Sequence, residues 1–260
     1  MTAIESVKQL FRHRVLAQVL IARELKVRYR GTIFGFLWSL LNPLVLTLTY
    51  MLVFSTILRV EMAHFHVFLL SAVLPWTCFA STIIESTVSI LGNGGLIKKV
   101  PLPSEIFPLI NVGTNMVHCL LGSLVLIFIM IVSGAPLSWF LLLFPLILVI
   151  QVLFTYGLSL LMAALTVQFR DLQHMAPNLL TVWFFVTPIV YPMTMVPENL
   201  RRVVAFNPMT QLITAYQDIF YYGRAPSGTG LLLVALLSLI LLAFGLSFFD
   251  ARREFMAEEV

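Results

Sequence analysis

The sequence has few charged residues. They make up 11% of the chain, whereas 60% of its 260 residues are hydrophobic and the mean hydropathy is +0.97. A soluble domain of this length cannot bury so much apolar surface, so the composition excludes an ordinary water-soluble fold. The formal net charge of +4 comes mostly from one end of the chain. It indicates attraction to an anionic inner leaflet and not nucleic-acid binding.

Cysteine is equally scarce. The chain has two, Cys78 and Cys119, and both lie in apolar segments without C-x-x-C spacing. We expect both to be small buried hydrophobes. We also expect no metal site, because the remaining candidate ligands are scattered at membrane boundaries without ligand spacing: His13, His64, His66 and His174.

The chain also lacks the sequence motifs of an enzyme or of a nucleotide-hydrolysing subunit. It has no G-x-x-x-x-G-K-[ST] phosphate loop, and GNGG at 92–95 lacks the lysine-serine end, which predicts a flexible turn. We therefore expect no cofactor and no catalysis in this chain, and any nucleotide chemistry must come from another polypeptide. Only Glu85 of the 12 acidic residues lies well inside a predicted span. A pairing role is favoured there over proton relay.

What is present is a sharp junction at residues 23–43, where basic ARELKVRYRG runs directly into apolar TIFGFLWSLLNP. Its cations include Arg28 and Arg30, and this charge predicts a cytoplasmic N-terminus. Upstream, apolar residues recur at helical spacing, which predicts an amphipathic interface helix within residues 1–30. Simple anchoring of the chain and docking of a partner both fit that helix.

Six segments are long and apolar enough to cross a bilayer core of about 30 Å. We predict an all-α membrane protein in one domain, with both termini cytoplasmic and a tail at 250–260. Of the 16 Lys and Arg residues, 12 then lie inside and four outside, as the positive-inside rule requires. The predicted spans cover about 33–58, 66–91, 106–132, 137–166, 177–196 and 229–249.

Residues 197–228 are too apolar for a plain loop. Asn207-Pro208 is typical of a helix start and Gly223 of a stop, with an apolar stripe between them. About 15 helical residues are too few to cross the membrane. We predict short re-entrant or interfacial helices at the outer face.

Polar residues inside the predicted spans fall on two helical stripes. Asn111, Asn115 and His118 share one face of the third span, and a similar stripe on the fourth could be its neighbour: Gln151, Thr155 and Ser159. Such groups need partners within hydrocarbon, so these faces are expected to turn toward other helices or a wet cavity. Interhelical hydrogen bonding and substrate contact are the two interpretations.

Aromatic residues are concentrated near prolines in three of the spans. Their flat faces suit weak, repeated contacts with sugars, whereas the alternative is an interfacial belt plus packing. The candidates for lining a channel are Phe34, Trp38, Tyr50, Phe54, Trp76, Phe79, Trp183, Phe184 and Tyr191.

Six blocks together resemble the membrane subunit of ABC exporters for lipid-linked polysaccharides, the O-antigen, capsule and teichoic-acid group. The resemblance covers essentially the whole chain, and the blocks stand in the family's order. They are LKVRYRGTIFGFLWSLLNPL at 25–44, LPWTCFASTI at 74–83, LIKKVPLPSEIFPL at 96–109, FRDL at 169–172, TPIVYP at 187–192 and NPMTQLI at 207–213.

This resemblance implies a homodimeric permease in the bacterial inner membrane, bound to two copies of an ABC ATPase. It implies an aromatic-lined channel for undecaprenyl-linked polysaccharide, above all O-antigen, with outer gate helices at 197–228. Coupling to the ATPase would involve Lys98, Lys99, Arg170 and Asp171. We add the inference that Arg28 and Arg30 contact the lipid pyrophosphate, because Arg forks match phosphate oxygens, with inner-leaflet anchoring as the alternative.

Two alternatives stay open at this point. An ABC permease for a drug or small lipid would share the architecture. A proton-coupled secondary carrier or a membrane acyltransferase would need membrane-centred carboxylates or a His/Asp pair, for which His118 offers a start.

Overall fold

The computed structural model describes residues 8–9, 11–28, 30–31, 35–57, 62–99, 103–252 and 259. Every regular element in these ranges is a helix. The α-helices are α2 (Arg14–Arg28), α3 (Trp38–Met51), α4 (Phe65–Val88), α5 (Gly94–Lys99), α6 (Ile106–Val132), α7 (Phe144–Gln168), α8 (Leu172–Val186), α9 (Glu198–Phe206), α10 (Pro208–Gln217) and α11 (Gly228–Ala251). Short 3₁₀ or π segments extend several of them, including Leu52–Ile57 after α3 and Asp218–Tyr222 after α10.

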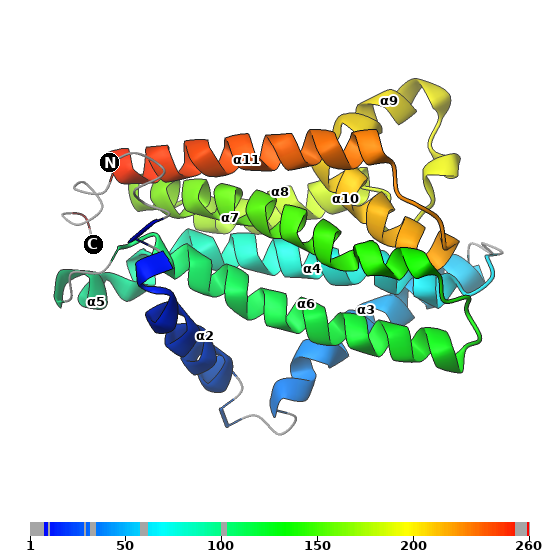
Figure 1. Ribbon diagram of the computed structural model, residues 1–260, viewed down its shortest axis with the longest axis horizontal. Helices are drawn as coiled ribbons and strands as arrows, with labels where there is room; N and C mark the ends of the chain where they lie inside the picture. The colour runs from blue at the N-terminus through cyan, green and yellow to red at the C-terminus, as the bar shows by residue number, and fades with distance from the viewer. Residues whose placement is uncertain are drawn as a thin grey trace.

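Helix α4 is the centre of the bundle. It contacts α3, α6, α7, α8 and α10, and it runs through the middle of the molecule in Figure 1. Three consecutive residues, Val67, Phe68 and Leu69, are each 0% exposed, so no face of the helix there meets the surroundings. A helix that is apolar on all sides is expected in such an interior position.

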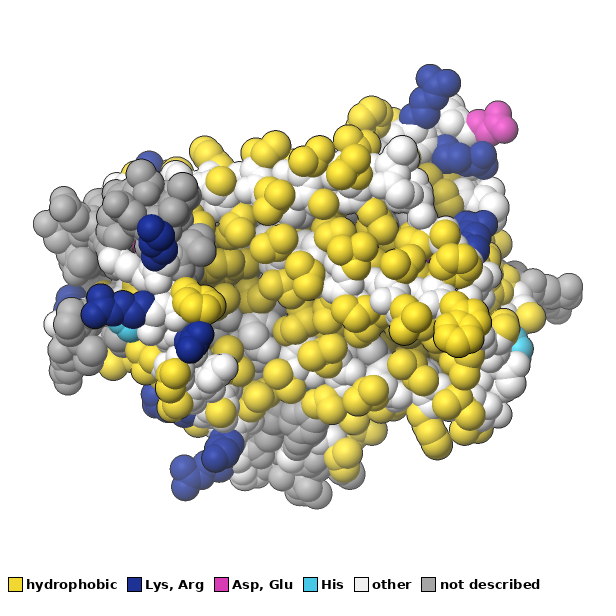
Figure 2. Space-filling view, viewed as in Figure 1, with side chains coloured by type: hydrophobic (Ala, Val, Ile, Leu, Met, Phe, Trp, Pro, Cys, Tyr) yellow, Lys and Arg dark blue, Asp and Glu magenta, His cyan; other side chains and the backbone are white. Residues whose placement is uncertain are grey.

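The outer surface of the bundle is apolar. Figure 2 shows hydrophobic side chains covering the middle of the molecule, with cationic side chains gathered toward the ends. A soluble protein rarely exposes a continuous apolar patch of this extent. The exposed side chains of α6, α7 and α11 include Leu124, Phe128, Ile131, Leu146, Val149, Leu232, Leu233 and Ile240.

Within the described residues, four helices are long and apolar enough to cross a membrane: Phe65–Val88, Ile106–Val132, Trp139–Gln168 and Gly228–Ala251. The segments predicted as first and fifth spans are shorter, with an apolar helix at Leu40–Ser55 and with α8, which has 15 residues. At 1.5 Å per residue, α8 covers only about 22 Å. The six-span count stays a prediction.

Helix α8 ends earlier than the predicted span at 177–196 because of one proline. Pro188 disfavours helical backbone at the residue before it, and Thr187 is extended, with φ −92° and ψ 135°. The TPIVYP block at 187–192 is therefore a turn and not the end of a helix. At its other end, α8 begins at Leu172, directly after the turn at 169–171.

The two ends of the bundle differ. In Figure 1, α2 and α5 lie at one end and α9 at the other. The predicted helix start at Asn207-Pro208 is confirmed, since Asn207 Oδ1 accepts a hydrogen bond from the Met209 amide at 3.0 Å. The predicted stop is also confirmed, because Gly223 caps the following turn with φ +60°. Helix α10 itself is buried against α4, α7 and α11.

Helices α7 and α11 pack most closely, through two glycines. A Cβ on Gly157 would lie 2.8 Å from the Leu242 amide nitrogen, and one on Gly245 would lie 2.7 Å from the Gly157 carbonyl oxygen. Backbone atoms cannot move aside as side chains can. Any larger residue at Gly157 must therefore push the two helices apart.

Candidate functional site

The surface helix α2 is held against α6 by apolar contacts. Ala17 is buried, and Leu16, Leu20 and Ile21 are partly buried in a cluster with the start of α6. Ile21 lies directly over Gly113, where an added Cβ would collide with the Ile21 side chain. These contacts place the last residue of α2, Arg28, beside α4 and α6.

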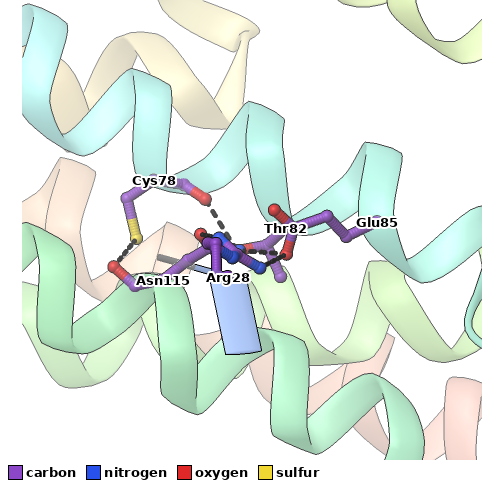
Figure 3. A network of polar contacts seen from close by, with 5 residues as sticks. All are labelled: Arg28, Cys78, Thr82, Glu85 and Asn115. Atoms are coloured by element: carbon purple, nitrogen blue, oxygen red, sulfur yellow. Dashed lines mark hydrogen bonds and ion pairs between the residues drawn. The ribbon is translucent and has the colours of Figure 1, made fainter. Parts of the chain in front are cut away.

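Arg28 joins three helices through charged and polar contacts. Its guanidinium donates to Glu85 Oε2 on α4 at 2.8 Å and to Asn115 Oδ1 on α6 at 3.1 Å. Asn115 Nδ2 donates to the same Glu85 oxygen at 2.8 Å, which closes the arrangement. Figure 3 shows Arg28 between α4 and α6, with Cys78 and Thr82 nearby. We call Arg28, Glu85 and Asn115 the polar triad.

The polar triad borders a cavity of about 720 Å³ between α3, α4 and α6. One part of the lining is polar and includes Asn42, Ser81 and His118, and another is apolar and includes Leu46 and Leu74. Mixed linings of this kind suit molecules that carry both a polar group and hydrocarbon. We call this space the large cavity.

A smaller cavity of about 270 Å³ lies on the side of α2 and α5. Its lining includes Glu24 on α2, Asn93 in the 3₁₀ segment between α4 and α5, Leu96 on α5 and Asn111 on α6. Arg28 and Glu85 line this small cavity as well as the large one.

The polar stripe on α6 faces these two cavities, as its sequence pattern predicts. Asn115 and His118 line the large cavity, and Asn111 lines the small one. The pairing role expected for Glu85 is confirmed by its contact with Arg28. Both native thiols, Cys78 and Cys119, are buried at the edge of the large cavity.

In the stripe on α7, Gln151 is held by α4 and α10. Gln151 is buried, donates to the Pro75 carbonyl oxygen on α4 at 2.8 Å and accepts from the Tyr216 hydroxyl on α10 at 2.7 Å. The periodicity of side chains cannot predict a backbone partner such as the Pro75 carbonyl oxygen. The sequence does predict that Gln151 needs a hydrogen-bond partner, because it is a polar residue inside an apolar run.

A second polar network joins the end of α8 to the start of α10. Trp183 Nε1 donates to Asn207 Oδ1 at 2.8 Å, and Asn207 Nδ2 donates to Thr187 Oγ1 at 2.9 Å. Gln217 Nε2 donates to the Pro188 carbonyl oxygen at 2.9 Å. The sequence marks Asn207 as a helix cap, but it gives no sign that the same side chain holds Trp183.

The structure brings most of the candidate aromatic residues together in one cluster. The ring centroids of Trp76 and Phe79 are 5.6 Å apart, and Trp183 is 6.3 Å from Trp76 and 5.3 Å from Phe79. Phe184 is 5.7 Å from Trp76 and stacks on Tyr50 at 5.6 Å. These distances are typical of favourable aromatic pairs.

The accessibility of these aromatic residues differs within the single chain. Phe79 is 0% exposed, and Trp76 and Phe184 are buried. Tyr50, Phe54, Trp183 and Tyr191 are half-buried, whereas Trp38 is 41% exposed and borders the large cavity. Phe34 lies outside the described residues.

The residues expected to couple to an ATPase lie at the surface. Lys98 on α5 is exposed, and so are Arg170 and Asp171 in the turn before α8. The side chain of Lys99 lies outside the described residues. Arg30 is exposed and borders a shallow cavity of about 370 Å³ together with Arg23 and Lys26.

At the end of α10, Asp218 and Arg224 form an ion pair with 2.7 Å between Oδ1 and Nε. Burial raises the pKa of Asp218 above its ordinary value, and the hydrogen bond and charge of Arg224 oppose that rise. The pair closes the turn whose cap is Gly223.

These features define a class of protein. Long apolar helices, an apolar outer surface and polar groups turned toward internal cavities are the properties of a multi-pass membrane protein. The chain belongs to the ABC-2 type transporter family, whose pattern it matches over residues 15–221, from α2 to the turn after α10.

Relatives of known name agree with this family. The chain is 38% identical over 259 residues to the O-antigen export system permease protein RfbA of Myxococcus xanthus. This match covers 99% of this chain and 100% of that protein. It is 35% identical over 210 residues to RfbA of Klebsiella pneumoniae, covering 80% and 81%. The polysialic acid transport protein KpsM of Escherichia coli is 25% identical over 253 residues, covering 94% and 95%.

The resemblance drawn from the sequence blocks is therefore confirmed at the level of the family. The relatives are permeases, the membrane components of transporters. The chain is a transporter subunit and not an enzyme itself, and its family implies a partner ATPase subunit.

Proposed function

We propose that this chain is the permease subunit of an ATP-driven exporter that moves undecaprenyl-linked polysaccharide, O-antigen above all, across the bacterial inner membrane. The observation that carries the proposal is the 38% identity to an O-antigen export permease over the full length of both chains. A match that covers every helix supports a shared transport task more strongly than a match to one segment.

The conduit would lie between two copies of this chain. Helix α3, the π segment after it and helix α8 expose apolar side chains, among them Leu48, Leu52, Val182 and Phe185. A second copy packed on these faces would cover them, and the adjoining half-buried rings of Tyr50, Phe54, Trp183 and Tyr191 would border the path. Flat aromatic faces allow sugars to slide, since each contact is weak and repeated.

The buried aromatic residues would pack behind the rings that border this path. Trp76, Phe79 and Phe184 pack against the rings of Tyr50 and Trp183 and fix their positions. We propose that Trp38, at the mouth of the large cavity, and Phe34 nearby in the sequence contribute at the cytoplasmic side. The helices at 197–228 would form the outer gate.

The head group of the lipid carrier would meet arginines at the end of α2. Guanidinium groups match the paired oxygens of a diphosphate, and Arg28 borders a cavity with both polar and apolar lining. Arg30 is exposed in the shallow cavity beside Arg23 and Lys26, where an anionic head group or inner-leaflet lipid would be attracted.

Energy would come from two copies of the ATPase subunit, which bind the ATP and Mg²⁺. With both termini cytoplasmic, the end of the bundle that carries α2 and α5 would face the ATPase. The exposed positions of Lys98, Arg170 and Asp171 at the surface support a docking role there, together with Lys99.

The test is export in the parent bacterium. Deleting the gene should abolish surface O-antigen, seen as the ladder of lipopolysaccharide bands on a gel, and lipid-linked glycan should accumulate inside. The wild-type gene should restore export only together with an ATPase that hydrolyses ATP. Continued export without ATP hydrolysis would overturn the proposal, and a normal ladder with altered drug or lipid export would favour the alternative substrate.

Aromatic variants test the conduit separately. Trp38→Ala and Tyr191→Ala should reduce export while the permease still co-purifies with its ATPase, because each removes contact surface without placing a charge in the bilayer. The exposed Trp139→Ala, far from α3 and α8 in the sequence, is the matched control and should export normally. Loss of assembled complex in Trp38→Ala and Tyr191→Ala, with normal assembly of the Trp139→Ala control, would assign these rings to packing alone.

A further inference from the structure

The ion pair of Arg28 and Glu85 lies at the boundary of the large and the small cavity. Among the described residues that line these spaces, Arg28 and Glu85 alone belong to both. The large cavity extends toward α3, and the small one toward the turn between α4 and α5. The pair is therefore part of the wall that separates the two spaces.

One half of this wall is fixed within the bundle. Glu85 Oε2 accepts from Asn115 Nδ2 at 2.8 Å, and both residues belong to helices that pack directly on each other. Asn115 is buried, and its backbone carbonyl oxygen also accepts from the Cys78 thiol. If the guanidinium leaves, Glu85 keeps a hydrogen-bond partner and its position.

The other half of the wall is Arg28, which belongs to the surface helix α2. Arg28 is the last residue of α2, and the Ile21 side chain of the same helix lies over Gly113 of α6. Seven residues separate the two, or about 10 Å along the helix axis. A tilt of α2 about Ile21 would therefore move Arg28 away from a carboxylate that stays in place.

The pair is also accessible enough to exchange partners. The side chains of Arg28 and Glu85 are 24% and 29% exposed, so both border water-sized space and neither is sealed in hydrocarbon. A diphosphate offers the guanidinium more negative charge and more acceptor oxygens than one carboxylate does. A ligand that binds only the released arginine shifts the population toward the open arrangement.

Resting on the function proposed above, we propose that the Arg28–Glu85 pair is a closed barrier between the two cavities. The diphosphate head group of a lipid-linked substrate opens it by replacing Glu85 as the partner of Arg28. Arg28 is then a positioning residue that links the binding of substrate to the position of α2.

The native cysteine in the large cavity provides the readout. In a Cys119→Ser background, Cys78 is the single cysteine of the chain and lines the large cavity. Permease assembled with its ATPase in inside-out vesicles is treated with charged methanethiosulfonate reagents, which do not cross hydrocarbon. The rate of Cys78 modification then reports passage from the side of α2.

Glu85→Gln and Arg28→Gln should each raise this rate about fivefold, the factor that corresponds to the loss of about 1 kcal/mol of ion-pair coupling. The matched control is Glu24→Gln, which removes a carboxylate that lines only the small cavity, and its rate should equal that of the parent. Undecaprenyl diphosphate should raise the parent rate, and uncharged undecaprenol should not.

The use of both a cationic and an anionic reagent distinguishes the opening of the barrier from electrostatic attraction of one reagent to the altered site. An opened barrier speeds both reagents, whereas a changed charge speeds one and slows the other, and that second result would overturn the proposal. Unchanged rates in both variants, or no response of the parent to undecaprenyl diphosphate, would overturn it as well. A chain that fails to export polysaccharide would still show the faster reaction of the variants, so the two failures are distinguishable.

Discussion

The buried hydrogen-bond networks around α10 and the polar triad at the end of α2 are built on different principles. Around α10, the network of Asn207, Trp183 and Thr187 and that of Gln151 and Tyr216 are neutral, and Gln151 and Tyr216 are fully buried. At the end of α2, the triad is charged and borders two cavities.

This difference has a physical consequence. A buried neutral network cannot open without leaving donors and acceptors unpaired in an apolar interior, so it favours one arrangement. A charged pair beside a cavity can exchange its partner for water or an anionic ligand at small cost. We therefore expect variants around α7, α8 and α10 to lower stability, and variants of the triad to alter transport instead.

The largest expected loss of stability is at the α7–α11 contact. Gly157→Leu places a side chain where a Cβ alone would lie 2.8 Å from backbone, so the helices must separate and little folded permease should be recovered. Size-exclusion chromatography of the detergent-solubilised complex measures this. Gly95→Ala is the control, because its Cβ would enter open space. Normal recovery of Gly157→Leu would show that this side of the bundle is not rigid.

The next largest effect is expected at Asn207. Asn207→Ala removes a helix cap and the partners of Trp183 and Thr187, which should cost about 2–4 kcal/mol. Thermal unfolding followed by tryptophan fluorescence should show a lower Tm. Asn178→Ala, whose exposed amide bonds only its own helix, should leave Tm unchanged. An equal Tm for both variants would contradict the role of the network.

A smaller loss is expected at Gln151. Gln151→Leu leaves the buried Tyr216 hydroxyl and the Pro75 carbonyl without this partner, at a cost of about 1–2 kcal/mol. Adding Tyr216→Phe should recover part of the lost stability, because both polar partners are then absent. If the two losses of Tm simply add, the side chains are not coupled.

The smallest change in stability is expected at Glu85. Glu85→Gln keeps its size and an acceptor oxygen, and the pair is partly exposed, so the loss should be about 1 kcal/mol or less. The same thermal unfolding measurement applies, with Glu24→Gln as the matched change of charge. A fall in Tm as large as that of Asn207→Ala would remove the contrast between the polar triad and the networks around α10.

The sequence predicted local features well. Helix positions at 106–132 and 229–249 correspond closely to α6 and α11, and the cap at Asn207 is where Asn-Pro predicts it. These features depend on neighbours within a few residues. The end of α8 was not predicted, although Pro188 marks it, because an apolar run outweighed the local effect of a proline.

The sequence did not predict which residues distant in the chain contact each other. Glu85 was expected to pair, but the choice of Arg28, 57 residues away, depends on how α2 lies across α6. The aromatic residues were selected by type, whereas their burial follows from the central place of α4.

The amino-acid sequence by itself determined the membrane class and the helical secondary structure, because composition and periodicity act through each residue's own preference for hydrocarbon or water. Six sequence blocks in order carried the resemblance to the family. Only the tertiary structure decided that Arg28 meets Glu85 and Asn115, and that Arg28 and Glu85 line two cavities. The physical reason is that such contacts depend on the crossing of three helices, and their geometry is set by packing along whole faces and not by any single stretch of chain.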